Sequence, residues 1–302
     1  MRKGQRFTPA RLVRWLDHGR GTGRGADYQP WHQVTRDDPG SRGRSHLINW
    51  RFGRLHHLLS DQELVAFGFA SMLPGVVDLR EQFPLAHDEH PPELAAYQVD
   101  RHGLTMPGTL QIAEDLGHKH PWVRKGEDDE PWVMTTDLLL TLFNRMGRSE
   151  LLAISVKHAD ELSDKRTLEL LRIEREYWRR QDVYWLLLNS TLYNDMVANA
   201  IRVGMAWTVG QPDVAPELRA VCAGLAPKIH GRSYRQCLEL ISRQLSIDIQ
   251  AAQCVMWQAI WSGQLPINLS RSMRMNQPLE LLSPAAFWQQ NPIASRRTAW
   301  SH

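Results

Sequence analysis

Cysteine is scarce in this chain: only Cys222, Cys237 and Cys254 occur among 302 residues. They lie far apart and form no CxxC pair, so the sequence indicates neither a disulfide framework nor a zinc site. Reduced thiols buried in a core are typical of a cytoplasmic protein. We therefore expect a cytoplasmic protein.

Long hydrophobic runs are also lacking. No apolar stretch approaches the roughly 20 residues that span a bilayer, and the start has no signal-peptide h-region. We therefore expect no membrane partner. The composition, 42% apolar and 23% charged, is that of an ordinary soluble globular protein. A chain of 302 residues has room for about two domains.

Net charge is low, but it is unevenly distributed. Residues 1–30 hold seven Lys and Arg against two Asp, a balance of +5, which leaves −2 for the rest because the whole chain carries +3. A basic segment on a near-neutral body favours a polyanion such as DNA. We interpret residues 1–27 as a flexible basic arm that binds DNA non-specifically; a solvated tail without function is the alternative.

Two apolar segments, residues 133–140 and 151–157, are predicted to be neighbouring buried strands. Asp137 lies in the first and Lys157 ends the second, so the two side chains can meet at one end of the sheet. Burying both is costly unless they pair with each other or bind something. A plain Asp–Lys ion pair is the simplest interpretation.

The spacing is similar to the PD-(D/E)xK nuclease pattern, a lone Asp followed by a strand ending in x-x-Lys. In that pattern, the Asp and the residue two before the Lys ligate Mg²⁺. A main-chain carbonyl between them, here that of Val156, helps. Ser155 stands where a carboxylate or Gln is usual. The resemblance implies that Ser155 acts through water or leaves the Val156 carbonyl to serve.

Two glutamates need an explanation of their own. Ser60 and Glu63 fit a capping box at the start of a helix, in which the glutamate bonds back to the N-cap amide. That role alone would explain Glu63. Glu81 shares a strand face with Val77, Leu79 and Phe83, so it points where apolar side chains point and needs a partner there.

Arginines are dense between the basic turn around residue 42 and the strand around residue 80. Cationic side chains near a catalytic face suit a phosphate backbone. We expect DNA binding by Arg42, Arg44, Arg51, Arg54 and Arg80.

The predicted elements indicate two domains. A helix at residues 163–180 joins the strand ending at Lys157 to a strand at 183–188, which predicts a parallel crossover. Residues 28–195 should thus form an α/β domain with a mixed sheet flanked by helices. Residues 196–302 should form an α-rich winged-helix domain.

The winged helix is predicted from its element order. Helices at 234–245 and 248–261 precede a hairpin of residues 265–269 and 278–282. We expect the tail after Pro292 to be loose.

Seven blocks in a fixed order resemble the TnsA family, the endonuclease subunits of heteromeric DNA transposases. The resemblance runs from about Tyr28 to the winged helix. The blocks are Ser41-Arg42-Gly43-Arg44, Leu58-Leu59-Ser60-Asp61-x-Glu63, Val77-Asp78-Leu79-Arg80-Glu81-Gln82-Phe83-Pro84-Leu85, His120-Pro121, Met134-Thr135-Thr136-Asp137, Val156-Lys157 and Ile173-Glu174-Arg175-x-Tyr177-Trp178.

This resemblance implies an α/β PD-(D/E)xK restriction-endonuclease-like catalytic domain. Glu63, Asp137 and Lys157 would form its active centre, with Gln82 and Glu174 in support. Two Mg²⁺ ions, replaceable by Mn²⁺, would be held by the two carboxylates and a main-chain carbonyl. They would activate the water and stabilise the leaving 3′-oxygen.

The implied function is hydrolysis of the 5′ strands at transposon ends. A TnsB-like DDE transposase would cut and join the 3′ ends, and a TnsC-like AAA+ regulator would dock on the C-terminal domain. Double-stranded DNA is the expected substrate. Two alternatives stay open: a catalytically impaired assembly factor that bridges transposase and regulator, and a stand-alone nuclease.

Overall fold

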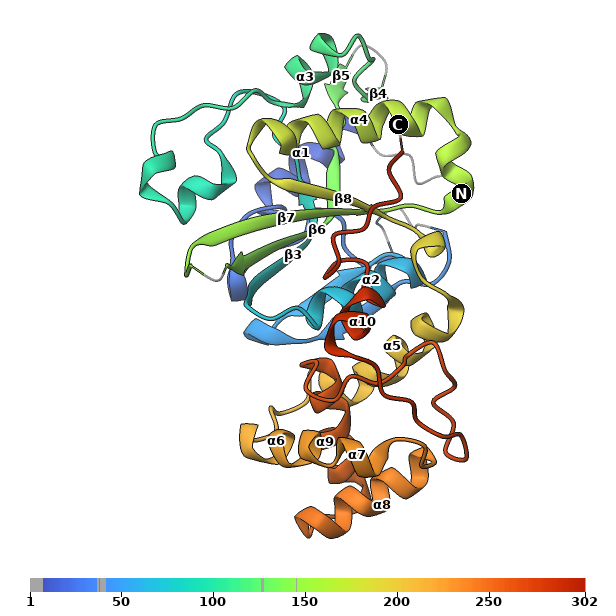
Figure 1. The fold of residues 1–302 in the computed structure, drawn as a ribbon. Helices are drawn as coiled ribbons and strands as arrows, with labels where there is room; N and C mark the ends of the chain where they lie inside the picture. The colour runs from blue at the N-terminus through green and yellow to red at the C-terminus, as the bar shows by residue number, and fades with distance from the viewer. Residues whose placement is uncertain (1–7, 37, 39–41, 126–127, 145, 302) are drawn as a thin grey trace.

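A four-stranded sheet forms the centre of the molecule (Figure 1). The computed structural model describes residues 8–36, 38, 42–125, 128–144 and 146–301. In spatial order the strands are β3 (Val76–Pro84), β6 (Thr135–Phe143), β7 (Ser149–Val156) and β8 (Tyr184–Leu188). The first three pair antiparallel, and β8 pairs parallel to β7. The predicted mixed sheet is confirmed.

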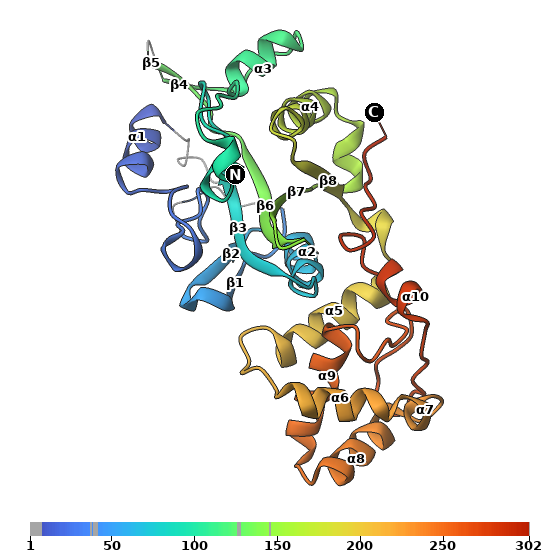
Figure 2. The same ribbon diagram turned by 60° about the vertical axis from the view of Figure 1, so that its left-hand side comes forward.

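Helices cover both faces of the sheet, as Figure 2 shows. Helix α4 (Lys165–Arg180) links the parallel strands β7 and β8 and buries Leu171, Ile173, Tyr177 and Trp178. Helix α2 (Asp61–Ser71) lies on the other face and is buried on nearly all sides, because α5 (Asp195–Thr208) packs against it. Apolar strands with a helix layer on each face are typical of an α/β domain.

The remaining elements lie around this core. Before α2 come α1 (Pro9–Asp17) and the hairpin of β1 (His46–Asn49) and β2 (Leu55–Leu58). Between β3 and β6 lie α3 (Thr109–Asp115), β4 (Trp122–Lys125) and β5 (Asp128–Pro131). The C-terminal helices are α6 (Pro216–Gly224), α7 (Ala226–Ile229), α8 (Tyr234–Leu245), α9 (Ile249–Trp261) and α10 (Pro284–Gln289). Within the described part of the chain, no helix is long and apolar enough to cross a bilayer.

The described part of the N-terminal segment, residues 8–27, is packed against the body rather than a flexible arm. Helix α1 begins after the N-cap Thr8 and buries Leu12 and Trp15. The Trp15 ring meets Trp31 edge-on at 5.4 Å. Arg20 donates to Asp38 at 2.6 Å, so its charge is satisfied within the protein. The expected arm is wrong for these residues, and residues 1–7 lie outside the described residues.

The glycine cluster after α1 lets the chain run close to the end of β3. Gly21 and Gly23 have φ values of 79° and 87°, which glycine adopts without the penalty that a Cβ brings. A Cβ on Gly21 would lie 2.4 Å from the Cγ of Pro84. The cluster therefore serves close packing.

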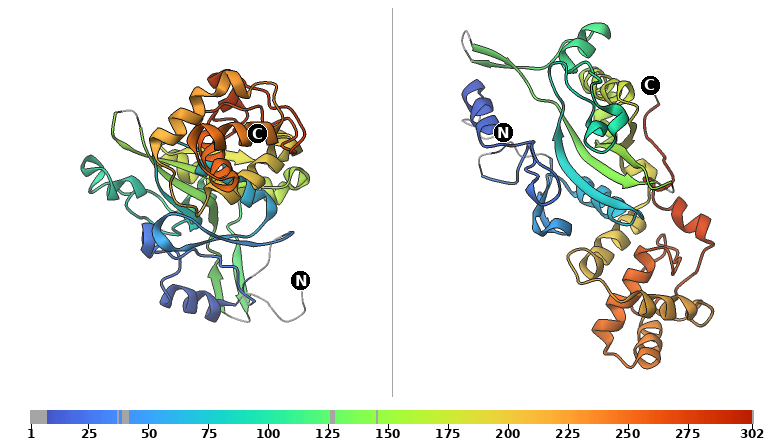
Figure 3. Two further views of the ribbon diagram at one scale, coloured as in Figure 1. Left: turned by 90° about the horizontal axis from the view of Figure 1, so that it is seen from below. Right: turned by 90° about the vertical axis from the view of Figure 1, so that its left-hand side faces the viewer.

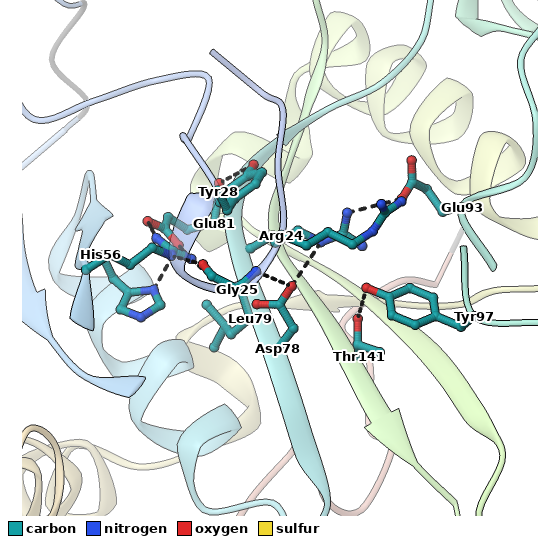
Figure 4. A network of polar contacts seen from close by, with 12 residues as sticks. Arg24, Gly25, Tyr28, His56, Asp78, Leu79, Glu81, Glu93, Tyr97 and Thr141 are labelled. Atoms are coloured by element: carbon teal, nitrogen blue, oxygen red, sulfur yellow. Dashed lines mark hydrogen bonds and ion pairs between the residues drawn. The ribbon is translucent and has the colours of Figure 1, made fainter. Parts of the chain in front are cut away.

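The outer edge of β3 is capped by polar groups from the N-terminal third of the chain (Figure 4). Exposed strand edges invite pairing with other chains, and native proteins cover them. The donors and their carbonyl acceptors are Arg51 to Val76, Arg54 to Leu79, the Tyr28 hydroxyl to Glu81 and the Trp31 amide to Gln82.

The opposite edge, β8, is covered by the C-terminal tail, which was expected to be loose. The amide of Ala299 donates to the Leu187 carbonyl at 2.8 Å, and the Leu187 amide donates to Thr298 Oγ1 at 3.0 Å. Trp300 packs edge-on against Trp185. An uncovered edge strand supplies the free backbone groups that hold the tail.

The C-terminal helices α8 and α9 lie close to their predicted bounds, but the predicted wing is reduced. Residues 265–269 and 278–282 form no paired strands; one bridge, Ile267 to Leu281, joins them. The winged-helix assignment is therefore not confirmed. Figure 3 (right) shows these helices gathered at one end of the molecule, beyond α2. One buried cluster runs from the sheet into them, and the division into two domains near residue 195 stays a prediction.

The packing of α5 on α9 predicts opposite effects for two helical glycines. A Cβ on Gly204 would lie 2.6 Å from the Trp261 ring, whereas one on Gly224 would meet open space. Gly204→Ala should lower the free energy of unfolding by about 1–3 kcal/mol through overpacking. Gly224→Ala should raise it by about 0.4–1 kcal/mol. Urea unfolding of both variants tests this, and a Gly204→Ala variant as stable as the parent would contradict the packing.

Candidate active site

A small pocket of 180 Å³ lies where the end of β7 meets the start of α2. Its walls include Glu63, Gln82, Asp137, Val156 and Lys157. Three larger pockets, of 420, 560 and 390 Å³, contain none of these five residues. We assign the site by its chemistry rather than its size, because it brings carboxylates and a lysine together in one pocket.

Asp137 and Lys157 meet as the sequence predicted. The β6–β7 register pairs Leu138 with Ile154, which brings the two strand ends together. Asp137 Oδ2 accepts a hydrogen bond from the Val156 amide at 2.6 Å and another from Lys157 Nζ at 3.3 Å. The backbone of β7 thus holds the carboxylate in place.

The ammonium of Lys157 lies between two oxygens. Besides Asp137 Oδ2, it donates to the Val156 carbonyl at 3.1 Å. Burial works against its charge, but Asp137, Glu174 and Glu63 outweigh burial and raise the pKa of Lys157 above its ordinary value. In this structure a positive charge therefore bridges the Asp137 carboxylate and the Val156 carbonyl, the two oxygens expected to ligate a metal.

Glu63 both caps α2 and faces the pocket. Its amide donates to Ser60 Oγ at 3.1 Å, which is the N-cap half of a capping box. The expected return bond to the Ser60 amide is not the one formed: Glu63 Oε2 accepts from the Leu59 amide at 2.9 Å. Burial, followed by the charge of Asp137, raises the pKa of Glu63 from 4.5 to about 8.

Gln82 bridges the two carboxylates. Its side-chain Nε2 donates to Glu63 Oε2 at 3.2 Å and to Asp137 Oδ1 at 3.3 Å. The residue has a φ of 48°, a conformation that costs energy in a non-glycine residue. It also breaks the alternation of β3, so Phe83 packs against Trp178 on the α4 face rather than sharing a face with Leu79.

Glu81 has a structural partner set of its own (Figure 4). It is fully buried and accepts from both terminal nitrogens of Arg54, at 2.7 and 3.0 Å. His56 Nδ1 lies 2.9 Å from its second oxygen. Burial alone would raise the pKa of Glu81, but His56 and Arg54 lower it to about 2. The partner that the sequence required for Glu81 is thus present.

Five arginines were expected to bind DNA, and for two of them this prediction is wrong. Arg54 is paired with Glu81 in the interior, and Arg80 is 2% exposed and donates to Glu93. Arg54 cannot reach a phosphate without leaving the buried Glu81 carboxylate without its ion pair, and the Arg80 side chain is itself buried.

The other three arginines are exposed. Arg51 lies at the start of β3, the opposite end from the pocket. Arg42 lines the pocket, and Arg44 lies beside it through an ion pair with Asp61 at the start of α2; the neighbouring Ser41 lies outside the described residues. Arg42 and Arg44 are the two that fit the expectation.

Ser155 does not line the pocket, which contradicts its expected place in the active centre. It is fully buried on the α4 side, where its hydroxyl donates to Glu174 Oε1 and accepts from Trp185 Nε1 at 3.0 Å. Alternation along β7 directs Ser155 towards α4. The strand ends at Val156, so the Lys157 side chain is free to turn back towards Asp137.

Glu174 connects this buried network to the pocket electrostatically. Its Oε1 also accepts from the Thr136 hydroxyl at 2.6 Å, next to Asp137 in β6. Burial, followed by the charge of Asp137, raises the pKa of Glu174 to about 6. Glu174 fits a supporting role behind the sheet, because its charge acts on Lys157 from outside the pocket.

Three further residues line the pocket and were missed by the sequence reasoning. Gln62 and His158 are the chain neighbours of Glu63 and Lys157, and Glu161 follows on the next turn. Adjacency to a candidate catalytic residue was the available signal. It is weak, because chain neighbours usually point in different directions.

The donor set fits one class of metal. Among the described residues, no group of three or more His, Cys, Asp and Glu side chains is arranged to hold an ion. Glu63, Asp137 and the Val156 carbonyl offer oxygen ligands only. Mg²⁺ prefers oxygen, is commonly held by one or two carboxylates and keeps several waters. Burial and the charge of Asp137 raise the pKa of Glu63, and a cation bound beside the two carboxylates would oppose that rise.

Comparison with known proteins identifies relatives. The family model described as "TnsA-like endonuclease N terminal" matches residues 73–190, which include Gln82, Asp137, Ser155, Lys157 and Glu174. The transposon Tn7 transposition protein TnsA of Escherichia coli is 32% identical over 279 residues. The alignment covers 91% of this chain and 92% of that protein.

Glu63 predicts a pH dependence of stability in metal-free protein. Because its pKa is raised in the folded state, the native protein holds this proton more tightly than the unfolded chain. The stabilisation is complete below the usual pKa of 4.5 and is lost as pH rises through about 8. In EDTA, Glu63→Gln should remove this fall and be more stable than the parent at pH 8, by on the order of 1 kcal/mol.

Urea unfolding at several pH values measures this difference. Glu174 titrates in both proteins, so the difference between them isolates Glu63. Parallel pH profiles for parent and variant would contradict the burial of an uncompensated Glu63.

Ser155 predicts a loss of stability rather than of metal binding. Ser155→Ala leaves Glu174 short of one donor and the Trp185 indole N–H without an acceptor, which should cost about 1–3 kcal/mol. Ser163→Ala, at an exposed serine after β7, is the control and should change stability by less than about 0.5 kcal/mol. Weaker Mg²⁺ binding by Ser155→Ala at unchanged stability would restore Ser155 to the active centre.

Proposed function

This chain belongs to the TnsA family, and we propose that it is the DNA endonuclease subunit of a heteromeric transposase. The observation that carries the proposal is the meeting of Glu63, Asp137 and Lys157 in one pocket. Two carboxylates and a lysine at the end of a mixed sheet suit metal-assisted hydrolysis of a phosphodiester bond.

Glu63, Asp137 and the Val156 carbonyl would hold Mg²⁺, and Mn²⁺ can take its place; we propose two ions in each site. The metal would activate the attacking water and stabilise the leaving 3′-oxygen. The residues of the chain do the positioning. The Val156 amide fixes Asp137, and Gln82 fixes the distance between the two carboxylates.

Lys157 would offset the negative charge that builds on the phosphate. Its ammonium is kept protonated by the carboxylates around it. It already lies within 3.3 Å of Asp137 Oδ2, so a water held at the carboxylates would be within its reach. Arg42 and Arg44 would contact the DNA backbone on either side of the pocket.

We further propose that the strand cut is the 5′ strand at each transposon end, within the bacterial cytoplasm. A TnsB-like DDE transposase would cut and join the 3′ ends, so that together they excise the element. The C-terminal helices, residues 196–302, would dock a TnsC-like AAA+ regulator.

The competing function is an assembly factor without catalytic activity. It is favoured by one observation: Ser155 adds no carboxylate to the pocket and instead bonds to Glu174 outside it. The raised pKa of Glu63 argues against this function. Keeping two carboxylates buried close together costs free energy, and such pairs are typical of working sites.

The proposal predicts a cleavage pattern. In Mg²⁺ with the partner transposase, the parent should nick the 5′ strand of a labelled transposon end. Asp137→Ala and Glu63→Gln should lower that rate by more than about 100-fold, because both remove a negative metal ligand. Joining of the 3′ ends by the partner should persist.

Glu114→Gln, at an exposed carboxylate on α3, is the matched control and should cut at the parental rate. Equal 5′ cleavage by the parent and Asp137→Ala would exclude this active site. Normal 3′ joining with no 5′ cleavage by the parent would establish the assembly factor instead.

A further inference from the structure

Gln62 and His158 bond to each other across the candidate active site. Gln62 precedes Glu63 on α2, and His158 follows Lys157 after β7, so the pair links the two elements that carry the catalytic groups. The Gln62 side-chain Nε2 lies 2.9 Å from His158 Nδ1. Both residues line the pocket.

Each member of this pair keeps one buried polar atom without a partner. Among the described residues, neither Gln62 Oε1 nor His158 Nε2 has a hydrogen-bond partner, although both atoms are buried. Leaving a buried polar atom unpaired costs free energy, so native proteins rarely retain one without a reason. A hydrogen-bond partner that enters the pocket from outside would give His158 Nε2 the bond that it lacks.

The hydrogen bond to Gln62 decides what His158 can offer. When the Gln62 amide donates to Nδ1, the neutral imidazole carries its proton on Nε2. The unpaired nitrogen is then a donor and requires an acceptor. Lys157 and Arg42 line the same pocket as His158 and carry the positive charges that an anionic oxygen would meet there.

We propose that His158 binds the substrate: its Nε2–H donates to a non-bridging oxygen of a DNA phosphate next to the bond that is cut. Gln62 is then a positioning residue that orients the imidazole. This inference rests on the proposed function, because it supplies a contact for the same DNA strand. A metal-ligand role fits less well, since Nε2 carries a proton and Mg²⁺ prefers oxygen.

Two substitutions at His158 distinguish a phosphate contact from a purely structural role, because each keeps a different one of its two hydrogen bonds. Asn places an amide where Nδ1 lies and can keep the bond to Gln62, but it has no group at the Nε2 position. Gln reaches the Nε2 position with an amide N–H and gives up the bond to Gln62. His158→Asn thus removes the donor to the phosphate, and His158→Gln removes the hydrogen bond to Gln62.

The test is equilibrium binding of the full-length protein, in EDTA, to a duplex that carries the transposon end. His158→Asn should bind about tenfold more weakly, the value of a hydrogen bond to a charged group, and His158→Gln should keep most of the affinity. A second set of duplexes carries single methylphosphonate linkages around the cleavage site. At one position, a methylphosphonate should weaken DNA binding by the parent about tenfold. The same linkage should not weaken DNA binding by His158→Asn any further.

The coupling between residue and phosphate decides the outcome. The proposal is overturned if every methylphosphonate weakens binding of His158→Asn as much as it weakens binding of the parent. It is also overturned if only His158→Gln loses affinity, because the Gln62–His158 pair then serves only to hold α2 to the end of β7. Cleavage by the parent is scored separately in Mg²⁺ with the partner transposase. If the parent shows this coupling in binding but never nicks DNA, the proposed nuclease function is wrong and the proposed phosphate contact still holds.

Discussion

The close approach of two buried carboxylates, Glu63 and Asp137, is the constraint on which the rest of this structure depends. Without a bound cation their charges repel, and burial, followed by this repulsion, raises the pKa of Glu63. The fold offsets this repulsion with an amide from Gln82, an amide from Val156 and the ammonium of Lys157. The strained backbone at Gln82 is the local cost of placing that amide between the two carboxylates.

A second buried network supports the site from the other face of the sheet. Glu174 accepts from Ser155 and Thr136, and the indoles of Trp185 and Trp178 complete the hydrogen bonds of those two hydroxyls. The C-terminal tail reaches the same place, because Trp300 packs on Trp185. The ends of the chain thus stabilise the sheet at both edges, the N-terminal third at β3 and the tail at β8.

Sequence reasoning succeeded where a pattern is local and failed where partners come from distant segments. Alternation and apolar runs predicted the mixed sheet, the parallel crossover and the pairing of Asp137 with Lys157. It failed for Arg54 and Arg80, because an arginine that pairs with a buried carboxylate looks the same in sequence as one that awaits a phosphate. It failed for residues 8–27 for a related reason: their basic charge was visible, but the Arg20–Asp38 bond was not.

The sequence by itself determined the chemistry that is available: an Asp and a Lys at the ends of adjacent strands, a capped helix with Glu63 in its first turn, and the family to which these blocks belong. Only the tertiary structure decided which groups meet. Alternation along β7 turned Ser155 away from the pocket, and the end of the strand at Val156 let Lys157 turn towards Asp137. The fold also brought Gln62 and His158 together across the pocket. Local propensities act over a few residues, whereas hydrogen bonds between buried side chains depend on contacts between residues far apart in the chain.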